Sequence, residues 1–307
     1  GIAAPAQQRY PRAIRILLTP HMPRLKLLPW AAVVTIGLGS TAAQAAFDIR
    51  LNLDSVAPGY RSYFEAAESF WEGVITGYQP GIALSGLNIR AATFNGSPGG
   101  TLGFAGWTDG IRSQGYALAT DGTMSFDLAD VPGLVQNGQF AAVIQHEMAH
   151  VLGFGTLWTS NYNGVYQDGT GRYTGPAALA EYRREFSQPG AQWVPVELGG
   201  GAGTANGHWN EVDGGSGPTG FTDGSGRNMR NELMTGWLNG PTFVSRTTVA
   251  SFQDIGYTVN LRALAGVVPA PAALAMAGVV PEPATLALWL MGLPLLAGVA
   301  AQRRQRV

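Results

Sequence analysis

The sequence of 307 residues contains no cysteine. A chain without cysteine has no disulfide bond, no thiolate metal ligand and no cysteine nucleophile, so its stability must come from its core and from any bound metal. Histidine is nearly as scarce, with four residues in the whole chain. Any site that needs several imidazole groups must therefore use almost all of them.

Charged residues make up only 13% of the chain, and the two signs are unevenly distributed. Residues 46–283 hold all 20 acidic residues but only 11 of the 19 basic ones, which gives this part a net charge of −9. An acidic surface repels phosphate backbones, so nucleic acid is not an expected partner. The apolar fraction of 46% is sufficient for a packed core.

Residues 1–45 are typical of a signal region. A basic stretch at residues 22–26 precedes an apolar run over residues 27–38, and residues 43–45 form an Ala-Gln-Ala cleavage site. The apolar run is too short to span a membrane comfortably. We therefore expect an exported chain that is cleaved near Ala45.

The C-terminal end combines Pro-Glu-Pro at residues 281–283, an apolar stretch over residues 284–301 and three terminal arginines. It resembles the PEP-CTERM sorting tail of bacterial envelope proteins. This resemblance implies that residues 281–307 anchor the chain transiently in the inner membrane until an exosortase cuts near Pro-Glu-Pro. Residues 265–280 are rich in Ala, Val, Pro and Gly, which is typical of a linker.

The central part, residues 46–264, combines strands and helices, which predicts an α+β fold. Apolar residues at spacings of one to four predict an amphipathic helix over residues 63–75, and a second helix over residues 139–152 follows Gly138. Three segments are predicted as strands: residues 47–53, 82–92 and 123–128. Glycine-rich segments at residues 199–203 and 214–226 predict long loops in the second half.

The second predicted helix contains the motif His-Glu-Met-Ala-His at residues 146–150. Positions four apart share one helical face, so His146 and His150 can bind one zinc ion, while Glu147 projects toward an activated water as a general base. Because His21 lies in the signal region, the mature chain keeps three histidines, the number that a catalytic zinc site needs. The motif therefore predicts a metal centre.

Gly153, three residues after His150, allows the helix to stop and the backbone to turn sharply. The pattern H-E-x-x-H-x-x-G resembles the metzincin peptidases, but Thr156 stands where their third histidine is expected. The sequence is more specifically similar to the leishmanolysin family, in which an insertion separates the glycine from the third histidine. The matching segments are residues 146–154, 207–211 (Gly-His-Trp-Asn-Glu), 231–236 (Asn-Glu-Leu-Met-Thr-Gly) and 251–260.

This resemblance implies that His208, 58 residues beyond His150, is the third zinc ligand and that Met234 is the Met-turn residue beneath the metal. It also implies a metzincin-like domain with a twisted mixed sheet, an active-site helix and a loop-rich C-terminal subdomain. The implied activity is secreted, zinc-dependent endopeptidase action. An extended peptide substrate is expected along a sheet edge formed by strands within residues 101–128.

Two alternatives stay open at this point. A gluzincin-type peptidase would use a glutamate as the third ligand, and Glu181 or Glu185 in the helical-looking residues 177–186 would be the candidates. A non-catalytic envelope or matrix protein could keep the zinc site for structure alone, although such a site has no need of Glu147 as a base. The Asp- and Gly-rich residues 213–223 are a candidate calcium loop.

Overall fold

A computed structural model describes residues 46–265, except for residue 202 and residues 211–219. The predicted signal region, the sorting tail and nearly all of the linker therefore lie outside the described residues. Most of the candidate calcium loop lies outside them as well.

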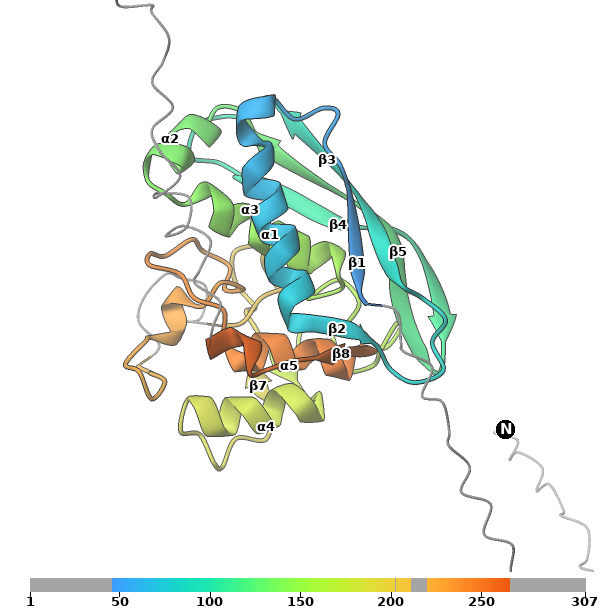
Figure 1. The fold of residues 1–307 in the computed structure, drawn as a ribbon. Helices are drawn as coiled ribbons and strands as arrows, with labels where there is room; N and C mark the ends of the chain where they lie inside the picture. Colours follow the sequence, from blue (N-terminus) through green and yellow to red (C-terminus); the bar gives the residue numbers. More distant parts are fainter. Residues whose placement is uncertain (1–45, 202, 211–219, 266–307) are drawn as a thin grey trace, which may run out of the picture. The chain divides into compact units, whose positions relative to one another are not determined.

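A four-stranded mixed sheet dominates the N-terminal part, with the strand order β1-β3-β5-β4 (Figure 1). Its strands are β1 (Asp48–Asn52), β3 (Gly86–Phe94), β4 (Gly103–Ser113) and β5 (Tyr116–Asp127). The first, third and fifth strands run parallel, and β4 pairs antiparallel with β5 at the edge of the sheet. Met124 and Phe126 of β5 are both buried, since side chains two apart on a strand point to the same face.

Helices α1 (Arg61–Val74) and α3 (Phe140–Val151) cover one face of this sheet (Figure 1). Helix α1 buries Phe64, Ala67, Phe70, Trp71 and Val74, which recur at one-, three- and four-residue spacings. The indole nitrogen of Trp71 donates a hydrogen bond of 3.0 Å to the carbonyl oxygen of Gln145. This bond fixes α1 against the helix that carries the His-Glu-Met-Ala-His motif.

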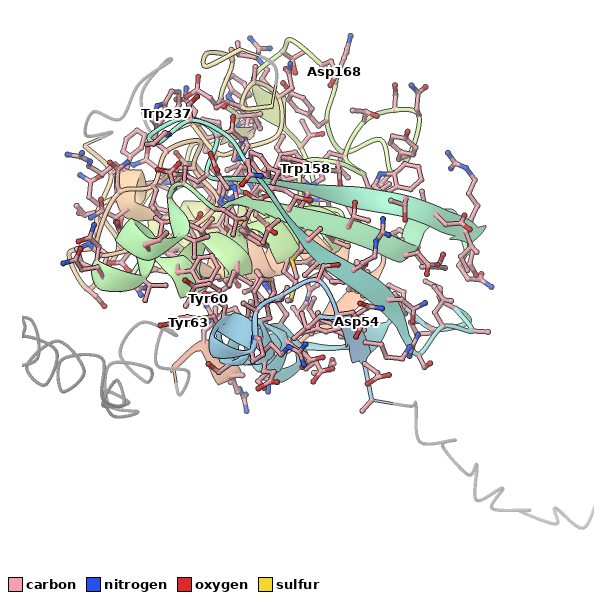
Figure 2. The ribbon with its side chains drawn as sticks, turned by 90° about the horizontal axis from the view of Figure 1, so that it is seen from above. Asp54, Tyr60, Tyr63, Trp158, Asp168 and Trp237 are labelled. Carbon is pink, nitrogen blue, oxygen red and sulfur yellow. The ribbon has the colours of Figure 1, made fainter. Side chains whose placement is uncertain are left out.

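The starts of these two helices pack through aromatic rings. The rings of Tyr60 and Tyr63 lie together at one end of α1 (Figure 2) and contact Phe140, at centroid distances of 5.7 and 5.3 Å. Helix α3 is buried along nearly its whole length, because it packs against α1 and the sheet and contacts the C-terminal part through the bond between His146 and the Leu233 carbonyl. A helix in that position keeps a fixed orientation, which is useful for side chains that must converge on one point.

The C-terminal part contains helices α4 (Pro176–Glu185) and α5 (Arg246–Asp254), which pack side by side (Figure 1). Two small antiparallel pairs join β2 (Ile75–Tyr78) to β8 (Tyr257–Val259) and β6 (Arg172–Tyr173) to β7 (Val194–Pro195). The remaining elements are α2 (Val131–Gln136) and the 3-10 helices Pro58–Tyr60, Met229–Asn231 and Ala263–Ala265. The β2–β8 pair joins the N-terminal part to the end of the domain.

The structure confirms a mixed fold of helices and a twisted mixed sheet, with several shifted boundaries. The strand predicted over residues 123–128 begins seven residues earlier, at Tyr116, and the strand predicted over residues 82–92 begins at Gly86. The segment over residues 177–186 is helical, as predicted. Helix α5 was not predicted, so the second half is less irregular than its glycine content indicates.

Candidate metal centre

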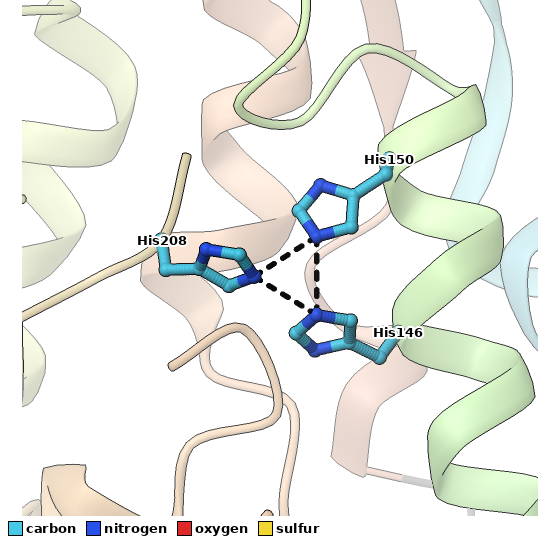
Figure 3. Close-up of side chains that lie close together, drawn as sticks. All are labelled: His146, His150 and His208. Atoms are coloured by element: carbon cyan, nitrogen blue, oxygen red, sulfur yellow. Dashed lines mark hydrogen bonds between the residues drawn. The ribbon is translucent and has the colours of Figure 1, made fainter. Parts of the chain in front are cut away.

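Helix α3 presents His146 and His150 on one face, because residues four apart lie one turn above each other. His208 approaches them from an irregular segment after β7 (Figure 3). The three Nε2 atoms lie 3.0 to 3.1 Å from one another. Among the described residues these histidines form the single group of three or more potential metal-binding side chains.

Each of these imidazole rings donates its Nδ1 hydrogen to a backbone carbonyl oxygen. His146 donates to Leu233 over 2.7 Å and His150 donates to Phe154 over 2.9 Å. His208 donates to Thr204 over 2.8 Å. Since the partner of one ring nitrogen fixes the tautomer, all three Nε2 atoms carry a lone pair rather than a hydrogen. The dashed contacts in Figure 3 therefore join three acceptors, which cannot bond to one another.

Three converging lone pairs are the donor set of a metal site. Around a tetrahedral zinc ion with Zn–N bonds of about 2.0–2.1 Å, the ligand nitrogens lie about 3.3–3.4 Å apart. The separations of 3.0 to 3.1 Å are close to this value, so a small outward movement of the rings would admit the ion. The residues present thus fit zinc.

Burial keeps the imidazoles neutral. It lowers the pKa of His146 to about 3, with a smaller contribution from neighbouring His150, and lowers the pKa of His150 to about 4. The pKa of His208 also lies well below its usual range, mainly through burial and then through the two other histidines. Neutral imidazole is the form that binds a metal ion, so the three side chains need not lose a proton before a cation binds.

Glu147 lies beside the histidines on α3, and its carboxyl group faces the start of strand β4. A methyl group on Gly103 would lie 3.1 Å from both Cγ and Oε1 of Glu147. Burial raises the pKa of Glu147 to about 8. A carboxyl group with such a pKa can hold and release a proton near neutral pH, as a general acid or base must.

Gly153 positions the carbonyl partner of His150. Its φ of +113° places the residue in the left-handed region that favours glycine, directly after α3 ends. The N–H of Phe154 then reaches back to the carbonyl of Ala149, and the Phe154 carbonyl accepts the Nδ1 hydrogen of His150. The turn that the glycine was predicted to make is therefore present, and it also orients a histidine.

Trp209 directly follows His208 in the chain, and its packing fixes the position of His208. Its ring is fully buried and stacks on Trp158, with centroids 4.9 Å apart, and it meets Phe154 and Tyr173 edge-on. Trp158 is among the residues marked in Figure 2. The backbone N–H of Trp209 donates to the carbonyl oxygen of Met234 over 3.0 Å. The His208 segment is therefore tied both to the aromatic core and to the turn around Met234.

Met234 is fully buried, and the residues beside it contact the histidine segments. The carbonyl of Leu233 binds His146, while the carbonyl of Met234 itself binds Trp209. The roles of the carbonyl groups of Leu233, Phe154 and Thr204 could not be predicted from the sequence, because every residue type has a backbone carbonyl. The close approach at Gly103 was likewise visible only in three dimensions.

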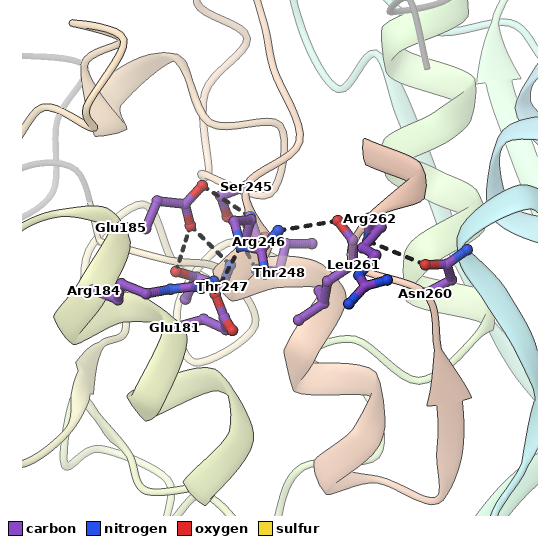
Figure 4. Close-up of polar contacts among 10 residues, drawn as sticks. All are labelled: Glu181, Arg184, Glu185, Ser245, Arg246, Thr247, Thr248, Asn260, Leu261 and Arg262. Atoms are coloured by element: carbon purple, nitrogen blue, oxygen red, sulfur yellow. Dashed lines mark hydrogen bonds and ion pairs between the residues drawn. The ribbon is translucent and has the colours of Figure 1, made fainter. Parts of the chain in front are cut away.

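The rival ligands Glu181 and Glu185 do not join the histidine group. Both extend from α4 toward the start of α5 (Figure 4). Glu181 forms ion pairs with Arg184 and Arg246. Glu185 accepts hydrogen bonds from the backbone N–H groups of Arg246 and Thr247. The structure therefore does not bring either glutamate together with the histidines, and both instead hold the start of α5.

The calcium hypothesis finds no support in the described residues. Within the candidate loop, residues 213–219 lie outside the described part. Asp223 binds Arg227 through an ion pair of 2.6 Å and accepts the N–H groups of Ser225 and Arg227. Its carboxylate is thus already neutralised by an arginine, which would repel a second cation.

Comparison with known proteins gives two matches to family models. The model described as leishmanolysin matches residues 118–273, and the model of the PEP-CTERM protein-sorting motif matches residues 279–304. No curated protein matches the chain. Within the part that the structure describes, none of the helices has the length and apolar character needed to cross a membrane, and the tail lies outside that part.

Proposed function

Because the chain belongs to the leishmanolysin family of metallopeptidases, we propose that it is a zinc-dependent endopeptidase with a metzincin-like domain. In this proposal His146, His150 and His208 hold the metal, Glu147 is the general base, and Gly153 and Met234 shape the surrounding turns. The observation that carries it is the convergence of three Nε2 lone pairs whose rings are all oriented by carbonyl partners.

A bound zinc ion would supply Lewis acidity, which acidifies water and polarises a peptide carbonyl. Glu147 accepts the proton of the attacking water and passes it to the nitrogen of the leaving amine. Its position on α3, within the same turn as both helix histidines, keeps the carboxyl group beside the reacting atoms. A nearby cation lowers the pKa of a carboxyl group. Metal binding would therefore lower the pKa of Glu147 from about 8 and favour its ionised form.

The edge strand β4 is the proposed binding place for an extended peptide. Among the described residues β4 pairs in its sheet with β5 alone, so its other edge has backbone groups that can pair with a substrate strand. The start of this strand lies against Glu147, as the contact at Gly103 shows. A peptide along this edge would therefore pass the general base.

The PEP-CTERM motif indicates export and sorting to the cell envelope. We propose four segments: a signal region at residues 1–45, a catalytic domain at 46–264, a linker at 265–280 and a sorting tail at 281–307 that an exosortase removes. Mass spectrometry of protein released by its native host should find no peptide beyond about Pro283. Recovery of Arg303 and Arg304 in released protein would contradict the proposed removal.

Peptide cleavage by the purified chain tests the activity. Substrates blocked at both ends should be cut internally, the activity should disappear after a strong chelator, and zinc should restore it. Exclusive cleavage of substrates with free ends would contradict endopeptidase action. Cleavage that survives complete metal removal would contradict the zinc mechanism.

A further inference from the structure

Glu232 is a buried carboxylate with no place in the chemistry described above. It is 1% exposed, and none of the ion pairs among the described residues includes it. Its Oε2 accepts the backbone N–H of Met234 over 2.6 Å. Its Oε1 accepts the backbone N–H of Ser245 and the hydroxyl of Ser245, each over 2.9 Å, and the hydroxyl of Thr248.

The first of these bonds fixes the turn that orients His146. The Met234 N–H follows Leu233 directly, and the Leu233 carbonyl accepts the Nδ1 hydrogen of His146. A backbone held on one side of this carbonyl cannot rotate freely. Glu232 is thus one residue away from a histidine partner and restrains the peptide unit between Leu233 and Met234.

The second set of bonds leads to His208. The indole nitrogen of Trp209 donates to the Thr248 hydroxyl over 2.8 Å, and that hydroxyl donates to Glu232. Trp209 also donates its backbone N–H to the Met234 carbonyl. The residue directly after His208 is therefore attached to the Glu232 network by its side chain and by its backbone.

From these contacts we infer that Glu232 is a positioning residue of the metal centre, which fixes the carbonyl partner of His146 and the segment that carries His208 at the same time. The inference rests on the proposed function. In this inference the glutamate of the Asn-Glu-Leu-Met-Thr-Gly segment does not contact the metal. It supports metal binding through the hydrogen bonds that it accepts. Removing such an outer partner of metal ligands costs about 10–100-fold in metal affinity.

Glutamine cannot replace this carboxylate. Both oxygens of Glu232 accept a backbone N–H, and a backbone N–H cannot accept in return. The amide NH₂ of glutamine would therefore face the backbone N–H of either Met234 or Ser245, and two donors cannot form a hydrogen bond. A buried donor left without an acceptor is costly, so one of the two attachments must open.

Glu185 provides a matched control. It also holds the first turn of α5, and each of its oxygens also accepts a backbone N–H, from Arg246 and from Thr247 (Figure 4). Among the described residues, Glu185 itself makes no hydrogen bond to Met234, Trp209 or Thr248. Glutamine in its place should disturb the same helix to a similar degree and leave the histidine partners intact.

The experiment compares Glu232→Gln with Glu185→Gln in the full chain. Zinc affinity is measured by competition with a chelator, the visible spectrum of the cobalt-substituted protein reports ligand geometry, and the melting temperature of the metal-free protein reports stability. We expect both variants to lose metal-free stability. Only Glu232→Gln should bind zinc about 10–100-fold more weakly and alter the cobalt spectrum.

A second pair keeps the test decisive if Glu232→Gln does not fold. Thr248→Val removes the hydroxyl between Glu232 and Trp209, whereas Thr247→Val removes the neighbouring buried hydroxyl, which donates to Glu185. Only Thr248→Val should weaken zinc binding.

Wild-type zinc affinity in Glu232→Gln would overturn the inference and leave the proposed function standing. An equal loss of zinc affinity in the two variants of each pair would do the same. Failure of the wild-type protein itself to bind zinc would instead overturn the proposed function, and the inference with it.

Discussion

Gly155 lies directly against the backbone of Gly207. A methyl group on Gly155 would lie 2.3 Å from the Gly207 carbonyl oxygen, and the φ of Gly155 is +72°. Two segments distant in sequence therefore touch with no side chain between them. This contact places the residue before His208 beside the turn that follows α3, so the third histidine can reach the pair on the helix.

Gly155→Ala should weaken zinc binding strongly, because the added methyl group must push Gly207, and His208 with it, away from α3. Gly164→Ala is the control. Gly164 has a similar φ of +69°, but an added methyl group would meet nothing within 4 Å. The control should lose only the backbone cost of about 1–2 kcal/mol in the free energy of unfolding. Equal zinc affinity in the two variants would show that the close approach is not needed.

Gly103→Ala should reduce turnover and preserve zinc binding. The new methyl group would lie 3.1 Å from Glu147, closer than carbon atoms normally pack, so the carboxyl group must move. A misplacement of about 1 Å can cost about a hundredfold in rate, so a smaller displacement of the proposed general base should lower kcat by less than that. Gly106→Ala on the same strand meets nothing within 4 Å and should leave the Glu147 carboxyl group in place, so any loss of kcat in it reports on peptide binding along β4 and is subtracted. A normal kcat in Gly103→Ala would count against the placement of the base beside β4.

Glu147→Gln should keep a full equivalent of zinc and lose most peptidase activity. The three imidazoles are untouched, but an amide cannot take up the proton of the attacking water, and losing a general base costs on the order of a hundredfold or more. Metal content and kcat measured on the same preparation separate these effects. Normal turnover would remove Glu147 from the mechanism.

Glu68 on helix α1 makes a pH-dependent contribution to stability. Burial, followed by the charges of Glu72, Asp48 and Glu65, raises its pKa from 4.5 to about 7. The folded chain then binds more protons than the unfolded chain between pH 4.5 and 7, so this contribution to the free energy of unfolding is lost as the pH rises through that window.

Glu68→Gln should therefore gain stability relative to wild type as the pH rises from 4.5 to 8, measured by urea denaturation across the range. Asp168→Asn, on an exposed loop (Figure 2), removes one negative charge from a different site and is the control for the change in net charge. A stability difference between Glu68→Gln and wild type that does not change with pH would contradict the assignment.

Regular apolar patterns predicted part of the fold, and the exceptions have physical causes. Strand β4 lies at a sheet edge and exposes much of its surface, so its sequence lacks strict alternation. Helix α5 buries Thr247, Thr248 and Ser251, whose hydroxyls are satisfied by internal hydrogen bonds. A pattern that treats buried positions as apolar does not detect such a helix.

The histidine group could be predicted from the His-Glu-Met-Ala-His motif for His146 and His150, and from the family resemblance together with the scarcity of histidine for His208. Its supporting groups could not, since Leu233 and Thr204 contribute backbone carbonyls from segments far apart in the chain. The role of Gly155 depends on a contact with Gly207 that no local pattern encodes. Residue chemistry therefore indicated the candidate ligands, while the groups that orient their rings could be identified only from the fold.

The assignment of His208 is the central claim, and zinc content per chain after dialysis against a weak chelator tests it most directly. The comparison takes wild type, His208→Ala and Glu181→Ala through one buffer. Two imidazoles hold zinc poorly, so His208→Ala should retain far less than one equivalent, whereas wild type and Glu181→Ala should each retain one. A full equivalent of zinc in His208→Ala, together with its loss in Glu181→Ala, would contradict the three-histidine site.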